Sequence, residues 1–288
     1  MREPNEITIR KQDVDKRIKK YKYEEKLYHY TSFTALIGIL SKQELWLGNT
    51  ANMNDKSEIV DFIEKLHTAV ANDIYPEKID DCDCFFEKVH NRLKSEYPFA
   101  LSFSKLNDNA AQWERYADDA HGVCIVFNTS AFMNLIYYSG ALFNEVFYKY
   151  DIRQHDHYKI LKEYFNTGVL KGLGDEKGEM DNLLLCAYMH KHESFCTESE
   201  IRLTNYWDRE IKRSKFAFEM VNGKMKKVLK VSLKELCSDE NIDFEDLIDA
   251  IVIAPRSEQN EQELKEYIED LGYKKLSNKI TRSQCPLR

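Results

Sequence analysis

Hydrophobic and polar residues follow two different periods along this chain, which predicts a mixture of strands and helices. Segments that alternate apolar with polar positions, or that are rich in aromatic and β-branched residues, predict strands. The expected strands are residues 26–32, 44–50, 99–105, 123–129, 141–151, 199–207, 226–233, 249–256 and 278–284. Residues 123–129 are apolar on both faces, which is typical of a central strand.

Apolar residues at helical spacing predict helices between these strands. Ser32 is placed to cap the first of them, where Leu36 and Leu40 recur one turn apart. The expected helices are residues 33–42, 52–70, 76–96, 107–122 and 258–271, with further helices within 153–193. The last region contains a glycine-rich break, "KGLGDEKGE", which we expect to be a mobile loop.

The elements alternate irregularly and do not form a regular βαβ series, so the sequence predicts an α+β fold. We expect one domain at residues 26–288, with a helical insertion around 153–193 and a charged N-terminal arm at 1–25. The basic stretch "KRIKKYKYEEK" at 16–26 suits either a solvated helix face or a local contact with nucleic acid.

Composition narrows the class of protein. No run of about 20 apolar residues occurs, so no membrane-spanning helix is expected, and the first residues lack the apolar core of a signal peptide. Seven scattered cysteines indicate reduced thiols and a cytoplasmic location. The net charge of −7 argues against a surface that binds nucleic acid over its whole extent.

Possible metal ligands are poorly spaced in the sequence. "DCDC" at 81–84 lacks the longer spacing and the second pair that zinc usually requires. The histidine pairs 155/157 and 190/192 would point apart on a helix. We therefore expect no metal. The sequence also lacks a G-x-S-x-G motif, a P-loop and a dinucleotide-binding glycine motif.

Three stretches carry the candidate chemistry. "ESEIRL" places Glu198, Glu200 and Arg202 on alternate residues, which a strand would direct to one face. That face meets water, an ion-pair network or a substrate. A carboxylate in a cleft can stabilise a sugar cation or bind a ribose hydroxyl, and an adjacent arginine would keep it ionised.

The other two stretches combine aromatic and hydroxyl side chains. "YHYTS" sets His29 and Thr31 on one strand face and the tyrosines, including Tyr30, on the other. "LSFSK" presents Ser102 and Ser104 together. In "QWERYAD", Trp113 and Tyr116 lie three residues apart and share a helix face, where they either bind a ligand or belong to the core.

These blocks resemble the prokaryotic domain of unknown function 2971 family (DUF2971). The resemblance lies in "LYHYTSFTALIGILSKQELWLGNTANMND", "LSFSKLNDNAAQWERYADDAHGVCIVF", "ESEIRL" and "IDAIVIAP", and it extends over roughly residues 27–285. The family pattern is in turn similar to that of ADP-ribosyltransferases, which implies a split β-sheet core with helical decoration.

The resemblance implies roles for particular residues. His29 would match the first-strand histidine that binds a ribose of NAD, and Ser102 and Ser104 the Ser-x-Ser strand. Tyr116 or Tyr30 would stack on nicotinamide, and Glu200 would match the late catalytic glutamate, with Glu198 completing an E-x-E spacing. Thr31, Trp113 and Arg202 are further substrate-binding candidates.

The resulting hypothesis is an NAD-consuming transferase whose acceptor is a protein, a nucleic acid or water. Such an enzyme would suit a toxin or a phage-defence effector. The sequence departs from the family pattern in two ways. It combines a first-strand histidine with a Ser-x-Ser strand, which are features of two different transferase branches, and it has Phe195 before the E-x-E block, where a tryptophan is usual. One ligand bridging His29 and Glu200 would require both to line a concave site within about 10 Å.

Two alternatives remain open. In the first, the same fold is a non-catalytic module that binds a nucleotide or a nucleic acid, with His29, Trp113 and Arg202 contacting a base and phosphates. In the second alternative the cluster is structural: Glu198 and Glu200 both pair with Arg202 in the core, and neither carboxylate is free for catalysis.

Overall fold

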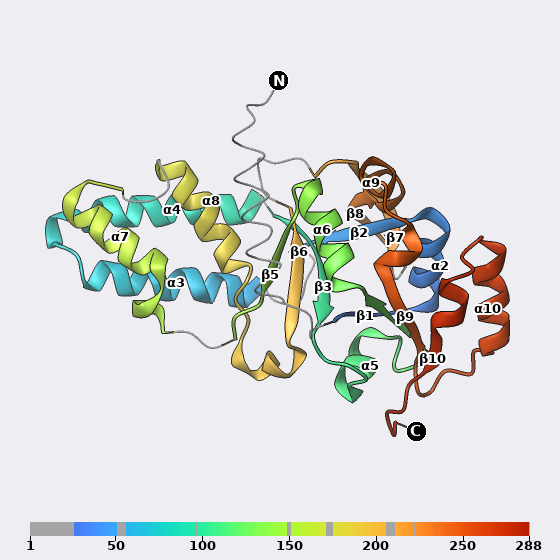
Figure 1. Cartoon of the computed structure of the whole chain (residues 1–288). Helices are drawn as coiled ribbons and strands as arrows, with labels where there is room; N and C mark the ends of the chain where they lie inside the picture. The colour runs from blue at the N-terminus through green and yellow to red at the C-terminus, as the bar shows by residue number, and fades with distance from the viewer. Residues whose placement is uncertain are drawn as a thin grey trace.

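The computed structural model describes residues 26–50, 56–95, 97–148, 151–170, 175–205, 211–221 and 223–287. The expected N-terminal arm at 1–25 lies outside the described residues. No helix in the described part of the chain has the length and apolar character needed to cross a bilayer. The fold is a mixed α and β architecture in which helices pack on a large sheet (Figure 1).

Ten strands within the described residues form one open sheet that is mostly antiparallel. The order is β10-β9-β4-β1-β3-β2-β8-β7, and β6 and β5 branch off beside β3. The strands are β1 (Leu27–Thr31), β2 (Glu44–Asn49), β3 (Phe99–Ser104), β4 (Val123–Phe127), β5 (Leu142–Glu145), β6 (Glu200–Thr204), β7 (Ser214–Val221), β8 (Lys224–Ser232), β9 (Ile248–Ile253) and β10 (Ile280–Arg282). Only β9 and β10 pair in parallel within this set.

The helices begin where side chains can accept hydrogen bonds from the first turn. Ser32 caps α2, as the sequence predicts, and Asn109 caps α5 in the same way. The helices are α2 (Phe33–Lys42), α3 (Lys56–Asn72), α4 (Ile79–Ser95), α5 (Ala110–Tyr116), α6 (Thr129–Ser139), α7 (Asp156–Thr167), α8 (Glu176–Ala187), α9 (Leu233–Glu240) and α10 (Glu261–Asp270). Short 3₁₀ helices cover Pro76–Lys78, Ile152–Gln154, Glu193–Glu198, Phe244–Leu247 and Leu276–Lys279.

The apolar core has two large parts. One part joins the sheet to α2, α6, α9 and α10. The other lies among α3, α4, α7 and α8, which form a bundle beside the sheet (Figure 1). A smaller cluster on β1 and β4 packs under α5. The helical layer therefore includes α3 and α4 in addition to the helices of the expected insertion around 153–193.

Strand β3 pairs with three strands, β1, β2 and β6, and its contacts with β1 and β6 position the candidate site. It meets β1 at one register pair, Tyr28 with Ser104, whereas it pairs with β6 over five residues, from Ala100 to Ser104. The β3–β6 register sets Ser104 opposite Glu200 and Ser102 opposite Arg202. Because directly paired residues share a face of a sheet, these four side chains lie on one side.

The expected elements agree with the structure in most places and differ from it in a few. The glycine-rich break is shorter than expected, because Asp175 caps α8 and the helix then includes Gly178. Residues 171–174 of the break lie outside the described residues. Helix α5 ends at Tyr116, before Gly122. Helices α6 and α9 and strand β7 were not anticipated.

Candidate functional site

The charged face of "ESEIRL" is buried. Glu198, Glu200 and Arg202 are 4%, 6% and 2% exposed, because β6 lies between β3 and β5. The expectation of one continuous strand face is wrong for Glu198, which ends a 3₁₀ helix one residue before the left-handed Ser199. The two carboxylates nevertheless meet, because both contact the ammonium of Lys191.

Glu200 makes contacts on both carboxylate oxygens. The Nε and Nη2 groups of Arg202 donate to its Oε1 and Oε2 at 2.8 and 3.1 Å. Ser102 Oγ donates to Oε1 at 2.5 Å, and Lys191 Nζ lies 3.4 Å from Oε2. Burial alone would raise the pKa of Glu200, but Arg202, Lys191 and Ser102 outweigh it and lower that pKa to about 2. Glu200 is therefore ionised at neutral pH.

Glu198 binds a different set of partners. Its carboxylate accepts from Lys191 Nζ at 2.6 Å, from Tyr116 Oη at 2.8 Å and from Arg115 Nη1 at 3.1 Å. Its main-chain carbonyl accepts from Ser104 Oγ at 2.7 Å. The side chain of Arg115 is 47% exposed and Tyr116 is 45% exposed, so Glu198 lies one layer below the surface at α5.

His29 joins this cluster through Ser102. The separation between His29 Nδ1 and the Ser102 carbonyl oxygen is 3.0 Å, so Nδ1–H donates to that carbonyl. Burial lowers the pKa of His29, and the bond to Ser102 opposes that shift without reversing it. Ser102 thus contacts His29 with its main chain and Glu200 with its side chain. We name these three residues the β1–β3–β6 triplet.

The remaining sequence candidates fall into two environments. Trp113 is fully buried and contacts Tyr30 edge-to-face at 4.8 Å between ring centroids. Both belong to the apolar cluster under α5, so neither ring is open to stack on nicotinamide. Tyr116 is half-exposed and does not share Trp113's buried side of α5. Thr31 ends β1 opposite Val123.

Three polar residues of the site were not predicted from the sequence. Lys191 joins the two carboxylates, Arg115 covers Glu198, and the main-chain N–H of Glu200 donates to Tyr148 Oη at 2.8 Å. Lys191 lies between the histidines of the 190/192 pair, and Arg115 lies within "QWERYAD". Their role was not evident because lysine and arginine beside a motif are usually solvated.

A cavity of about 860 Å³ lies between α3 and two other parts of the chain. One part contributes Tyr148 and residues 151–153, and the other contributes residues 190–193. Lys191 and Tyr148 line it, and both also contact the carboxylate cluster. His29 and Glu200 are not in its lining. Lys191 and Tyr148 lie between this cavity and Glu200. Tyr28 pairs with Ser104, so His29 points to the other face of the sheet, where it contacts Phe103. The expectation that His29 and Glu200 line one concave site is therefore wrong.

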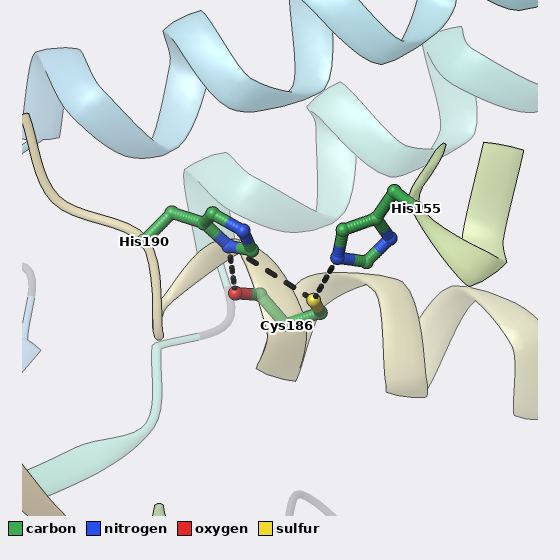
Figure 2. Close-up of side chains that lie close together, drawn as sticks. All are labelled: His155, Cys186 and His190. Carbon is green, nitrogen blue, oxygen red and sulfur yellow. Dashed lines mark hydrogen bonds between the residues drawn. The ribbon is translucent and has the colours of Figure 1, made fainter. Parts of the chain in front are cut away.

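Potential metal ligands meet at another point of the bundle. His155, Cys186 and His190 offer ligand atoms that all lie within 4.8 Å of one another (Figure 2). This group takes one histidine from each His-x-His pair, so the spacing argument within each pair did not apply. The "DCDC" cysteines diverge on α4, since Cys82 is buried and Cys84 is exposed.

Comparison with known proteins gives one match. Residues 112–203 match the family model described as Protein of unknown function (DUF2971). This match supports assignment of the chain to that family, over a shorter range than the sequence resemblance suggested. The matched range includes Tyr116, Lys191, Glu198, Glu200 and Arg202, but not His29 or Ser102. No curated protein and no solved structure matches the chain.

Proposed function

We propose that this DUF2971 family protein is an NAD-consuming enzyme of the ADP-ribosyltransferase type. The observation that carries the proposal is the ionised carboxylate of Glu200, which Arg202 and the Ser102 hydroxyl hold in place. The carbonyl of Ser102 also accepts from His29, which lies on the other face of the sheet. Three residues that the family resemblance selected from distant parts of the chain are thereby linked by two hydrogen bonds.

The sheet supports the same proposal. The single register pair between β1 and β3 divides the described strands into two groups: β1 with β4, β9 and β10, and β3 with β2, β5, β6, β7 and β8. A division of this kind suits the split sheet expected of an ADP-ribosyltransferase, with the triplet at the division. The assignment of this sheet to the ADP-ribosyltransferase fold is part of the proposal.

In the proposed reaction, the bond between nicotinamide and ribose breaks through an oxocarbenium-like transition state. Ionised Glu200 would stabilise the positive charge and accept a hydrogen bond from the ribose 2′-hydroxyl. One well-placed electrostatic group of this kind contributes on the order of 3–4 kcal/mol to transition-state stabilisation. Arg202 and Ser102 hold the carboxylate in one orientation before substrate arrives.

Substrate binding would require a small rearrangement at Glu200. A carboxylate accepts about four hydrogen bonds, and Glu200 already has four nearby donors. The weakest contact is that of Lys191 at 3.4 Å, and the same ammonium lies 2.6 Å from Glu198. A ribose hydroxyl would therefore replace Lys191 on Oε2, while Lys191 remains paired with Glu198.

The half-exposed side chains on α5 suggest how the substrate enters. Arg115 would bind a phosphate of NAD, because its guanidinium is exposed and forms charge-assisted hydrogen bonds. Tyr116 presents the ring that would stack on nicotinamide. Glu198, which accepts from both residues, would orient the acceptor nucleophile after nicotinamide leaves.

Nicotinamide release from NAD by purified protein tests the proposal. Wild type should release nicotinamide, alone or with cell extract as a source of acceptor, and Glu200→Gln should reduce the rate about 10²–10³-fold. Glu219→Gln is the matched control, because Glu219 pairs with Lys230 on the β7–β8 hairpin. An equal loss in both variants, or no release by wild type, would contradict the proposal.

A second candidate is a non-catalytic module that binds a nucleotide or another phosphate-bearing ligand. It is favoured by the charge of the cluster, in which Arg115, Lys191 and Arg202 surround two carboxylates. Under this alternative NAD or a related nucleotide binds without turnover. Arg115→Ala would then weaken binding, while Glu200→Gln would leave the ligand chemically unchanged.

A further inference from the structure

A cluster of two imidazoles and one thiol lies at the junction of three segments, outside the proposed NAD site. His155 precedes α7, Cys186 lies in the last turn of α8, and His190 follows α8 (Figure 2). His155 Nε2 is 3.3 Å from Cys186 Sγ, and His190 Nδ1 is 3.9 Å from the same sulfur.

The convergence follows from local structure. Cys186 and His190 are four residues apart across the end of α8, a spacing that places side chains on one face. His155 is held at the start of α7, where its Nδ1 accepts from the main-chain N–H of His157 at 3.3 Å. Phe62 stacks on His190 at 4.0 Å between centroids and contacts His155 edge-to-face. The start of α7 and the end of α8 thus direct ligand atoms to one point.

We propose that His155, Cys186 and His190 form a site for a Zn²⁺ ion. Two nitrogens and one thiolate sulfur are ligands that suit zinc. Zinc bonds of about 2.0–2.1 Å to nitrogen and 2.3 Å to sulfur place tetrahedral ligands about 3.5 Å apart. The two nitrogen–sulfur separations lie on either side of that value, so these two contacts need shifts of only a few tenths of an ångström.

Metal binding would replace the hydrogen bonds within the cluster. The Cys186 thiol gives its proton to solvent and binds as thiolate. His190 Nδ1 exchanges its 2.8 Å hydrogen bond to the Cys186 carbonyl for a bond to zinc. His155 carries its proton on Nδ1 when Nε2 binds the metal, so the long cap bond from His157 is given up. Each of these two changes gives up one neutral hydrogen bond.

The surroundings fit a cation. His157 stacks on His155 at 15° between ring planes and contacts Glu179 Oε1 at 2.7 Å. Glu179 is fully buried, and its Oε2 has no hydrogen-bond partner. A buried acidic side chain that contacts the cluster through the stacked ring of His157 favours a cation at this point. Cys186 is half-buried, so an ion can reach it.

Three protein ligands leave one position for water, the arrangement of zinc sites that keep an open coordination position. His190 lines the 860 Å³ cavity, which can supply that water. The next residue, Lys191, contacts both carboxylates of the proposed NAD site. The zinc site would thus fix the end of α8 and the segment that positions Lys191. Metal binding at this site is measured independently of NAD turnover.

Cobalt(II), which substitutes for zinc and reports its ligands by absorption, tests the site on the full-length chain freed of metal by a chelator. The expected result is one Co²⁺ per chain, with a thiolate-to-cobalt charge-transfer band that excess Zn²⁺ abolishes. Cys186→Ser should lose the band. Cys196→Ser, which changes an exposed cysteine elsewhere, should retain it.

A second measurement distinguishes loss of ligation from misfolding. Zn²⁺ should raise the melting temperature of wild type and of Cys196→Ser, and should not raise that of Cys186→Ser or His155→Gln. A band that persists in Cys186→Ser, binding of less than one ion per chain, or an equal melting shift in all variants would overturn the proposal.

Discussion

At the scale of single residues, the main feature is a carboxylate held ionised below the protein surface. Glu200 is 6% exposed and pairs with Arg202, which is 2% exposed. Removing one partner of a buried ion pair leaves the other charge unpaired, which is far more destabilising than loss of a surface pair. Two predictions follow from this difference.

Arg202→Ala should lower the free energy of unfolding by about 3–5 kcal/mol, because Glu200 then loses its bidentate partner. Arg213→Ala is the control, since Arg213 also binds a carboxylate through two nitrogens, that of Asp239, but at the surface. Urea unfolding of both variants provides the comparison. Similar midpoints for the two variants would show that the buried pair has no special importance.

Acid should destabilise wild type more than Glu200→Gln. The folded-state pKa of Glu200, about 2, is lower than its ordinary value of 4.5, so the ionised carboxylate stabilises the fold above about pH 4.5. That contribution, on the order of 3 kcal/mol, is lost as the pH falls from 4.5 towards 2. Unfolding free energies at pH 6 and pH 3 measure it. The same pH dependence in both proteins would place the titration on other groups.

At the scale of elements, close packing between strands and turns fixes the edge of the site. Gly122 precedes β4 where the turn after α5 passes β1, and a Cβ atom there would lie 2.2 Å from the Thr31 carbonyl oxygen. A real Cβ cannot approach so closely, so the backbone would have to move. A Cβ atom added to Gly38, within α2, would have no neighbouring atom within 4 Å.

These two glycines give opposite predictions. Gly122→Ala should destabilise the fold by about 1–3 kcal/mol through overpacking. Gly38→Ala should leave stability unchanged or raise it by up to about 1 kcal/mol, because alanine favours the helix. Thermal melting of both variants tests the pair. Stabilisation by Gly122→Ala would contradict the packing at the start of β4.

The sequence predicted elements best where periodicity and burial agree. β4 was expected as a central strand, and all five of its residues are buried. β7 was missed because it lies at the sheet edge, where Phe216, Phe218 and Met220 are exposed and the usual alternation of buried and exposed residues is weak. Helix α6 was missed because it follows β4 directly, after the Asn128 cap.

The site was predictable only in part, for a similar reason. Glu200, Ser102 and His29 lie in short motifs whose residue types suggest chemistry. Their contact depends on the pairing of β3 with both β1 and β6, which no local pattern encodes. Lys191 was missed because a lysine adjacent to a motif gives no signal until the fold buries it. The group of His155, Cys186 and His190 was not predicted, because it forms only when the start of α7 meets the end of α8 in the folded protein.

At the scale of the whole molecule, a helical bundle and a sheet meet along the segment that follows α8. That segment carries His190 towards the bundle and Lys191 towards the carboxylates of β6 and the preceding 3₁₀ helix. The cavity beside it is lined by both residues. The junction therefore connects the proposed zinc site to the proposed NAD site through adjacent residues.

The most direct test of the central claim is a double-mutant cycle on nicotinamide release, with wild type, Ser102→Ala, Glu200→Gln and the double variant. If Ser102 acts by orienting Glu200, the double variant should be no slower than Glu200→Gln alone. Additive losses would show that the two residues act separately, and the absence of release by wild type would contradict NAD chemistry at this site.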